Sequence, residues 1–415
     1  MKDIVRIGVI GCGARGDVLI NGVLIPLYKE GVQISGICDL YEDRTQKLAD
    51  QIEKECGYRP VCTADYKQII ALDVDAVIIT CAWEYHVEIA LAAMEAGKYV
   101  GMEVGGNFAM EDCWKLVDTS ERTGMPCMML ENCCYGKREL MVLNMVKKGL
   151  FGDIVACDGG YHHDLREEIA YGEENRHYRL RNYLHRNCEN YPTHELGPIC
   201  KVLNINRGNR LLTLTSMASS AKGLHAYIVQ KRGEDDKLAK AQFAQADIVK
   251  TVIRCAGGEL ITLTLDTTLP RAYSRGFTVR GTKGGYWEDM DAVFLDGKDN
   301  ENDFEPKKLW DNAKAYEDEY HHPLWKNYVP IGGHDGMDFL VLQAFIEAVR
   351  KGTQTPIDVY DTATWMCIST LSEQSISTGG TPQPIPDFTR GRWMERQAPA
   401  QLHYSLDLIT EHPFL

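Results

Sequence analysis

The sequence predicts a two-domain protein, in which a doubly wound parallel α/β sheet precedes an α+β domain with a mostly antiparallel open sheet. The chain has 415 residues, more than one ordinary hydrophobic core accommodates. Apolar runs alternate with helical patterns over residues 4–130, whereas later runs alternate in polarity and are separated by turn residues. We therefore expect one domain over residues 1–150 and a second over residues 151–415.

The first domain is predicted from its alternation of short strands and helices. An apolar run over residues 4–10 indicates a buried strand, a helical pattern covers 14–29, and a second apolar run covers 32–38. Further strands are expected at residues 75–80, 98–102 and 125–130, with helices at 85–96, 110–123 and 141–150. Such alternation builds a parallel sheet covered on both faces, whose ligands lie beyond the carboxyl ends of the strands.

The second domain is predicted to consist mainly of antiparallel strands followed by late helices. The strands are expected at residues 211–217, 246–255, 260–269, 277–280 and 285–289, and the helices at 337–349 and 362–377. Residues 220–241 are polar and charged, which indicates an exposed excursion. The tail contains many prolines, so we expect it to extend over the surface or over a neighbouring subunit.

Three glycines follow the first apolar run directly. Gly11 permits a tight turn, Gly13 lets the backbone approach a pyrophosphate, and Gly16 lets the helix pack closely on the strand. The helix N-terminus offers free N–H groups to the phosphates. Asp39 ends the next strand, where its carboxylate would accept hydrogen bonds from the ribose and repel a 2′-phosphate. The motif therefore predicts NAD binding, and a glycine-rich turn without a ligand is the alternative.

The composition excludes several classes of partner. A net charge of −14 argues against nucleic acid and anionic membranes, because both require clustered Lys and Arg. No apolar run approaches the roughly 20 residues of a membrane span, and the chain enters a strand within a few residues, so we expect a cytoplasmic protein. Fourteen cysteines are scattered without paired ligand spacing, which favours free thiols and no structural metal.

The densest group of reactive side chains lies between residues 159 and 194. Tyr161 and His163 point to one face of a predicted strand, and Tyr191 and His194 share a face at the start of a helical stretch. Such a set suits proton transfer at carbon and oxygen, with Arg166 and Arg179 available as cations. The alternative is a set of buried side chains that merely bond their neighbours.

At this point the chain resembles the Gfo/Idh/MocA oxidoreductase superfamily, and within it the NAD-dependent glycosidases of glycoside hydrolase family 109. The resemblance is carried by motifs spread over nearly the whole chain, namely residues 11–16, 83–86, 97–104, 131–132, 161–166, 178–181, 191–194, 270–274, 332–338 and 386–390. It implies a Rossmann domain and a tightly bound NAD that is recycled in each turnover. It also implies C3 oxidation, C1–C2 elimination, water addition and re-reduction of an α-N-acetylgalactosaminide or related glycoside.

The resemblance also implies roles for individual residues. The catalytic set is Tyr161, His163, Tyr191 and His194, with His194 as the base for the C3 hydroxyl and Tyr161 as the base at C2. The sugar contacts are Tyr161, Arg179, Tyr191, Thr193, His194 and Tyr273. The cofactor contacts are Gly11, Gly13, Ala14, Arg15, Gly16, Asp39, Trp83, Glu84, Tyr85, His86, Glu103, Val104, Asn132 and Tyr191.

Departures from the ordinary superfamily dehydrogenases leave alternatives open. Val104 stands where those enzymes carry a catalytic lysine, and Asn190 stands where they carry an aspartate. The common Gly-Gly-His-Gly-Gly motif of the glycosidases has Asp335 as its fourth residue here. The alternatives are an NAD-dependent sugar or cyclitol dehydrogenase, including one that forms 3-keto-glycosides, and a non-enzymatic NAD-binding protein. The resemblance further implies a homodimer or homotetramer.

Overall fold

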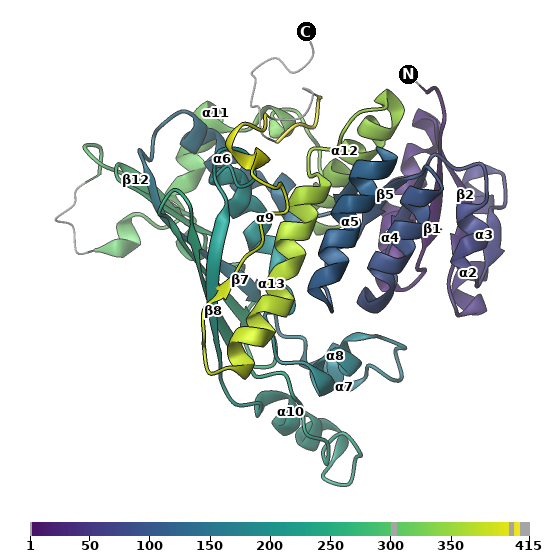
Figure 1. Cartoon of the computed structure of the whole chain (residues 1–415), viewed down its shortest axis with the longest axis horizontal. Helices are drawn as coiled ribbons and strands as arrows, with labels where there is room; N and C mark the ends of the chain where they lie inside the picture. Colours follow the sequence, from purple (N-terminus) through teal and green to yellow (C-terminus); the bar gives the residue numbers. More distant parts are fainter. Residues whose placement is uncertain (1, 300–304, 398–401, 407–415) are drawn as a thin grey trace. The chain divides into compact units, whose positions relative to one another are not determined.

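The computed structural model of the chain describes residues 2–299, 305–397 and 402–406 (Figure 1). The chain folds into two compact units. Unit 1 comprises Met1–Gly136, Pro323–Ala363 and Gln397–Leu415, and unit 2 comprises Lys137–His322 and Thr364–Arg396. Unit 1 thus includes two segments that follow the boundary expected at residue 150, and unit 2 begins before that boundary.

Unit 1 contains the predicted parallel sheet, in the strand order β3-β2-β1-β4-β5-β6. Its strands are β1 (Val5–Ile10), β2 (Val32–Cys38), β3 (Val61–Thr63), β4 (Ala76–Ile79), β5 (Tyr99–Met102) and β6 (Cys127–Met129). Every adjacent pair is parallel. All four residues of β4 are buried, as expected for a strand in the middle of a sheet covered on both faces. The doubly wound parallel fold is confirmed.

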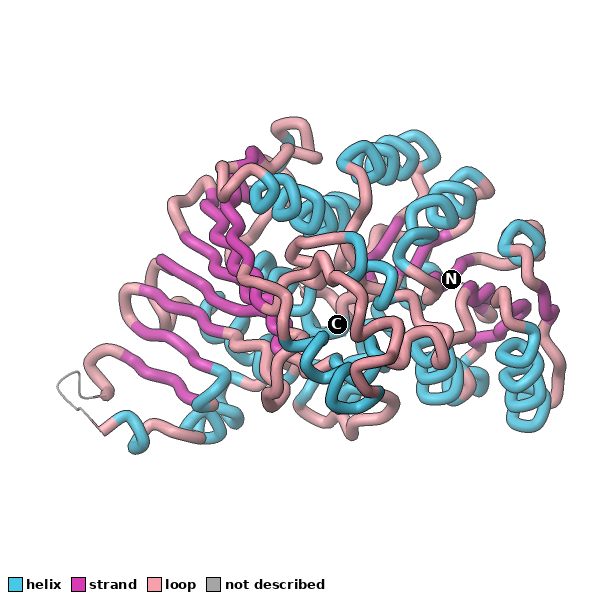
Figure 2. Tube along the Cα trace, turned by 90° about the horizontal axis from the view of Figure 1, so that it is seen from below, coloured by secondary structure: helices cyan, strands magenta, loops and turns pink. Residues whose placement is uncertain are grey.

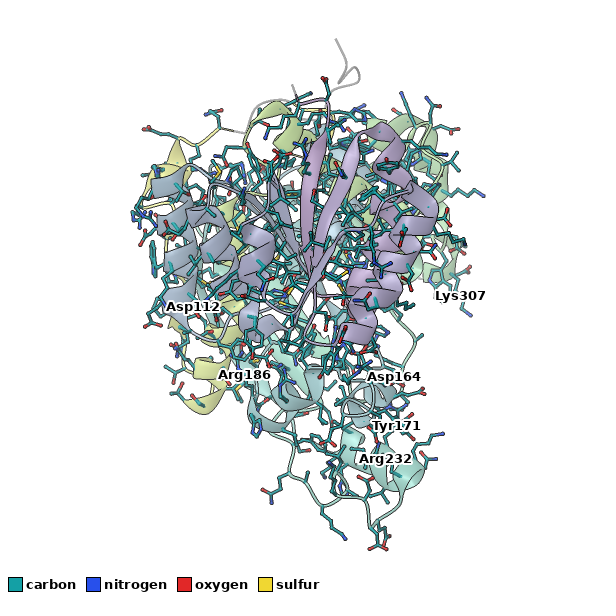
Figure 3. All side chains as sticks on the ribbon, turned by 90° about the vertical axis from the view of Figure 1, so that its right-hand side faces the viewer. Asp112, Asp164, Tyr171, Arg186, Arg232 and Lys307 are labelled. Carbon is teal, nitrogen blue, oxygen red and sulfur yellow. The ribbon has the colours of Figure 1, made fainter. Side chains whose placement is uncertain are left out.

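The helices of unit 1 lie on both sides of this sheet (Figure 3). They are α1 (Ala14–Leu19), α2 (Glu42–Cys56), α3 (Tyr66–Ile70), α4 (His86–Glu95), α5 (Met110–Thr123) and α12 (Met337–Lys351). Helix α5 matches its predicted bounds, with two acids in its first turn and Gly124 at φ +73° as its C-cap. The late helix α12 was expected in the second domain, but its residues belong to unit 1.

The helical pattern of residues 14–29 is interrupted after the first turns. Helix α1 continues as a π-helix over Ile20–Leu24 and then as a 3-10 helix over Pro26–Glu30. Pro26 lacks the N–H of a regular helix, which explains the break at that point. A Cβ on Gly22 would lie 3.4 Å from the Cα of Gly332, so the π-helical segment packs closely against a later loop of the same unit.

Unit 2 contains an open, mostly antiparallel sheet in the order β13-β12-β11-β7-β10-β9-β8-β14 (Figure 2). Its strands are β7 (Ile154–His162), β8 (Leu211–Ala218), β9 (Ile248–Cys255), β10 (Leu260–Asp266), β11 (Thr278–Gly281), β12 (Gly284–Trp287), β13 (Ala292–Leu295) and β14 (Gln383–Pro384). Only β7 and β10 run parallel among the described pairs. The α+β class is confirmed, and β14 shows that part of the tail joins the sheet.

The helices of unit 2 are α6 (Lys137–Lys147), α7 (Arg166–Ala170), α8 (Arg179–His185), α9 (Thr193–Val202), α10 (Gly223–Arg232) and α11 (Glu317–Tyr320). Helix α13 (Val359–Ser377) begins in unit 1 and ends in unit 2. The excursion of residues 220–241 contains α10, which the polar sequence did not predict. Asp247 accepts hydrogen bonds from the N–H groups of Lys222 and Gly223 and so caps this helix.

Two findings bear on the expected environment of the chain. Among the helices that the structure describes, none is both long and apolar enough to cross a membrane. All fourteen cysteines are free thiols.

Candidate active site

The glycine turn of unit 1 has no room for side chains at two of its three glycines. Gly11 has φ +111°, and a Cβ there would lie 2.4 Å from the backbone nitrogen of Cys81. A Cβ on Gly16 would lie 2.0 Å from the carbonyl oxygen of Gly11. A Cβ on Gly13 would meet nothing nearer than Arg44, at 3.4 Å. The turn therefore needs Gly11 and Gly16 for packing, while Gly13 keeps the backbone open to a ligand.

Asp39 follows the end of β2 and stabilises the glycine turn through hydrogen bonds to the backbone. Its Oδ2 accepts a hydrogen bond of 2.7 Å from the N–H of Cys12, and its Oδ1 accepts one of 3.0 Å from the N–H of Tyr41. The guanidinium of Arg44 lies 3.9 Å from Oδ2. Each carboxylate oxygen retains a lone pair, so Asp39 can still accept hydrogen bonds from ribose hydroxyls. An open glycine turn beside an acid fits a dinucleotide such as NAD.

The predicted cofactor residues Arg15, Glu103 and Asn132 are joined through Asp338. Both Asp338 oxygens accept hydrogen bonds from Arg15, of 2.7 and 2.9 Å, and Oδ1 also accepts one of 2.8 Å from Asn132. The other side of Arg15 donates to Glu103 at 2.8 Å. His334 lies 2.9 Å from Asp338 Oδ2, and the pKa of this buried Asp338 carboxyl is held below its usual value. Although residues 332–338 carry part of the resemblance, the sequence did not indicate this role for Asp338.

The segment after β4 combines two buried side chains with two exposed ones. Trp83 is buried and donates a hydrogen bond of 3.1 Å to the carbonyl of Val104, and His86 lies 3.0 Å from the carbonyl of Cys81. Burial lowers the pKa of His86 to about 4, so this histidine is neutral. Glu84 and Tyr85 are exposed. Trp83 and His86 thus shape the strand end, and only Glu84 and Tyr85 are open to a ligand through their side chains.

Tyr161 and His163 lie together at the end of β7. The phenol oxygen of Tyr161 lies 2.8 Å from Nδ1 of His163. Tyr161 is buried, and the pKa of His163 is lowered, first by burial and then by the charge of Arg179. A neutral His163 can accept the phenolic proton, so this pair forms a route for a proton out of the cluster. His162 faces the other side of the sheet, as the alternation predicted.

Tyr191 and His194 join the same cluster from the start of α9. The ring centroid of Tyr191 lies 4.3 Å from that of Tyr161, and the ring of His194 lies 5.4 Å from Tyr161 and 4.8 Å from Tyr191. Both are 8% exposed, so little solvent reaches them. Thr193 is buried, and its hydroxyl has no hydrogen-bond partner among the described residues. The structure therefore brings all four predicted catalytic residues together, with an available hydroxyl beside them.

Two cations were expected near these rings, and only Arg179 is there. Its guanidinium carbon lies 5.0 Å from the ring centroid of Tyr191 and 5.9 Å from that of Tyr161. Arg166 instead donates to Asp164 and lies over the ring of Tyr227. A guanidinium over a tyrosine stabilises its phenolate, because the opposite charges attract in a site with little water.

Tyr273 stands at the open side of this cluster. Its ring lies 5.1 Å from His163 and 6.5 Å from Tyr161, and it is 53% exposed. Of the six residues predicted to contact the sugar, Tyr273 is exposed and the other five are buried. Tyr273 can form one side of the entrance for a substrate.

A buried ion cluster, which the sequence did not reveal, supports β7 and α9. Arg275 pairs with Glu139 at 2.5 Å and with Glu195 at 3.2 Å, and its carbonyl accepts a hydrogen bond from the N–H of Gly160. A Cβ on Gly159 would lie 2.5 Å from the side chain of Glu195. Glu195 follows His194 in the chain, so this cluster fixes the helix that carries the histidine against the strand that carries Tyr161.

Two family models match the chain. Residues 5–130 match the oxidoreductase family with an NAD-binding Rossmann fold, and residues 135–395 match the C-terminal domain of glycosyl hydrolase 109. The fold is similar to that of an inositol dehydrogenase homologue from Azotobacter vinelandii in complex with NAD⁺. Its TM-score is 0.65 at 16% identity, over 92% of this chain and 98% of that chain.

Curated relatives match over almost their whole length. An α-N-acetylgalactosaminidase of Tannerella forsythia is 39% identical, over 94% of this chain and 88% of the relative. A glycosyl hydrolase family 109 protein of Solibacter usitatus is 38% identical, over 95% of this chain and 90% of the relative. The chain therefore belongs to glycoside hydrolase family 109 and is a glycosidase with an NAD-binding Rossmann fold.

Proposed function

We propose that this enzyme hydrolyses α-N-acetylgalactosaminides, or closely related glycosides, through transient oxidation of the sugar at C3, and that its NAD stays bound and is recycled. The observation that carries the proposal is the cluster around Tyr161, which lies 2.8 Å from His163 and beside the rings of Tyr191 and His194. The name of the Tannerella forsythia relative supports the choice of sugar.

When bound, NAD would supply the redox chemistry, namely acceptance of a hydride from C3 of the sugar and its return at the end of the turnover. The open backbone at Gly13 would take the pyrophosphate, and Asp39 would accept hydrogen bonds from the ribose. The remaining predicted cofactor contacts, such as Glu84, Tyr85 and the residues around Arg15, belong to this proposal as well.

His194 is the proposed base at the C3 hydroxyl. Loss of hydride from C3 makes a ketone only if the hydroxyl proton also leaves, so a base is needed next to that oxygen. Tyr191, whose ring lies 4.8 Å from that of His194, is placed to donate a hydrogen bond to the ketone oxygen or to orient the nicotinamide. Thr193 offers its unpartnered hydroxyl to another hydroxyl of the sugar.

Tyr161 is the proposed base at C2. A ketone at C3 makes the C2 proton acidic, and the phenolate of Tyr161 takes that proton while Arg179 stabilises the phenolate. The electron pair of the C2–H bond forms a C1–C2 double bond, and the bond from C1 to the leaving oxygen breaks. A water molecule gives one proton to the departing aglycone oxygen and its hydroxide adds to C1, while Tyr161 returns its proton to C2. Through the contact with His163, the proton held by Tyr161 can exchange with solvent between these two steps.

We further propose that the protein is a cytoplasmic homodimer or homotetramer. The strands β8, β9 and β10 expose Met217, Val252 and Leu260 on one face of the unit 2 sheet, and large apolar side chains on a sheet face are typical of an interface. Sedimentation velocity of the wild type and of a Val252→Lys variant tests this assembly. A monomer in both cases would contradict it, and fractionation of the source cells tests the location.

The experiment that tests the activity uses α- and β-nitrophenyl glycosides, including the N-acetylgalactosaminide, in D₂O. Nitrophenol release, deuterium at C2 of the released sugar and the absorbance of NADH are followed together. We expect aglycone release with deuterium at C2 and no net NADH. NADH that accumulates without aglycone release would show a net dehydrogenase instead, and release without deuterium at C2 would exclude the elimination route.

A further inference from the structure

An ion pair joins two short helices next to the tyrosine–histidine cluster. Oε1 of Glu168, on α7, lies 3.0 Å from Nε of Arg179, at the start of α8. The Arg179 side chain is 10% exposed and the Glu168 side chain 38%. The pair thus runs from the solvent side of α7 into the interior, where the guanidinium reaches the rings of Tyr161 and Tyr191.

Helix α7 is itself held in place by α10. Arg232 donates a hydrogen bond of 2.9 Å to the carbonyl of Ala170, and its guanidinium carbon lies 4.9 Å from the ring of Tyr171. The side chains of Arg232 and Tyr171, both labelled in Figure 3, lie near each other. Arg232 also pairs with Glu174 at 2.7 Å. The backbone that carries Glu168 is therefore held in place independently of Arg179. Glu168 thus keeps its position whether or not Arg179 is paired with it.

We propose that Glu168 is a positioning residue, which holds the guanidinium of Arg179 against Tyr161 and Tyr191 and so maintains the charge that stabilises a phenolate on Tyr161. This inference rests on the proposed function for its catalytic meaning, because Tyr161 is the base at C2 in that proposal. The physical reason is that a buried guanidinium without a carboxylate partner is costly, and a long arginine side chain can relieve the cost by turning toward water.

Other charged or titratable groups surround this pair, and Tyr178 and Tyr183 are among those that interact with Arg179. His177 lies 3.7 Å from the same Glu168 oxygen, so it is a second candidate partner of the carboxylate. On the side of the rings, Tyr161 faces His163, His194 and Tyr273 in addition to Tyr191. Asp164 is already paired with Arg166, at 2.6 Å. Glu168 is therefore a carboxylate whose replacement directly changes the surroundings of Arg179.

The test measures the ionisation of Tyr161 directly and needs no substrate. The ultraviolet absorbance of tyrosinate is titrated in the wild-type holoenzyme and in Tyr161→Phe, and the difference between the two curves reports Tyr161 alone. The same difference is then measured in Glu168→Ala, Glu168→Gln and Arg179→Ala backgrounds. Glu167→Gln is the matched control, because Glu167 is the exposed neighbour on the same helix and loses the same charge.

We expect Glu168→Ala to raise the midpoint of the Tyr161 titration by about one pH unit, because a cation leaves its place near the phenolate. Glu168→Gln removes the charge but keeps a side chain of the same length beside the guanidinium, so its midpoint should stay or fall. In the Arg179→Ala background, Glu168→Ala should have no further effect, since the two residues act as a unit. If Glu168→Ala does not fold, Glu168→Asp replaces it and should also raise the midpoint.

Other outcomes would overturn the inference. Equal downward shifts in Glu168→Ala and Glu168→Gln would show that Glu168 acts only through its charge. No shift, or a shift that persists in the Arg179→Ala background, would show that Arg179 does not depend on Glu168. Failure of the proposed function is distinct, because it appears as an absence of C2 exchange in the wild type whatever the Tyr161 titration shows.

Discussion

The phenol oxygen of Tyr161 lies 2.8 Å from Nδ1 of His163, which directly follows the last residue of β7 and still donates its N–H to the carbonyl of Asp266 on β10. Alternate residues of a strand point to one face, so the pair needs only one regular strand to meet. The surrounding rings and Arg179 come from other elements and bury the hydroxyl. This arrangement makes Tyr161 the side chain on which the proposed chemistry depends.

Replacing Tyr161 with phenylalanine removes the oxygen and keeps the ring. We expect turnover and C2 deuterium exchange to fall by about 10²- to 10⁴-fold, the usual contribution of a general base. Thermal stability should change little, because the ring still packs on Tyr191. Tyr320→Phe, which removes a phenol of unit 2 outside the cluster, serves as the control. Unchanged exchange in Tyr161→Phe would remove Tyr161 from the mechanism.

The pH dependence of exchange follows from the environment of His163. Its pKa is lowered by burial and by Arg179, so the imidazole stays neutral to a pH below the value of about 6.5 of a free histidine. We expect C2 exchange to be maintained as the pH falls through 6.5 and to decline only at lower pH, where His163 becomes protonated. A decline centred at or above 6.5 in a pH profile of exchange would contradict this expectation.

The glycines of the turn should respond differently to alanine. Gly16→Ala places a Cβ 2.0 Å from a backbone oxygen, so we expect a large loss of thermal stability. Gly13→Ala meets nothing nearer than 3.4 Å at an ordinary φ of −72°, so the protein should fold normally. It should nevertheless lose NAD affinity, measured by calorimetry on the apo form, because the methyl group occupies the approach of the pyrophosphate. Normal NAD affinity in Gly13→Ala would argue against this placement of the cofactor.

Asp338 directly contacts three side chains of unit 1, those of Arg15, Asn132 and His334. Asp338→Ala leaves Arg15 without its bidentate partner in a buried site, and we expect a loss of about 3–5 kcal/mol in the free energy of unfolding. Chemical denaturation with and without NAD measures it. Asp335→Asn is the control, because Asp335 is exposed and Asn tolerates its φ of +52°. Equal stability of the two variants would show that the Asp338 network is dispensable.

Glu189 is fully buried, and its carboxyl oxygens have no hydrogen-bond partner among the described residues. Burial raises its pKa to about 8. The unfolded chain loses this proton near pH 4.3, so the folded state binds more protons between that pH and about 8, and stability falls as the pH rises through this window. Glu189→Gln should therefore be more stable than the wild type at pH 8 and similar at pH 4. Thermal melts across this range check it, and identical pH slopes would contradict it.

The sequence by itself determined much of unit 1 and the members of the cluster. Buried parallel strands have continuous apolar sequences, so they could be predicted from local patterns. The turn could be predicted as well, because only glycine fits sterically at Gly11 and Gly16. Tyr161 with His163, and Tyr191 with His194, were also predictable, because each pair is close in sequence at one end of an element: His163 directly follows β7, and Tyr191 lies just before α9. The helix α10, within the polar residues 220–241, could not be predicted in this way. Its sequence lacks a clear apolar face, and its first turn is capped by Asp247, which is distant in sequence.

Only the tertiary structure decided which partners these residues have. Asp338 meets Arg15 across more than 300 positions of sequence, and Glu195 meets Arg275 beneath the glycines of β7. It also decided that Arg179, and not Arg166, lies over the tyrosines. The physical reason is that a charged side chain finds its partner through the packing of separate elements. Local periodicity fixes the face on which a residue lies, and it carries no information about what that face will meet.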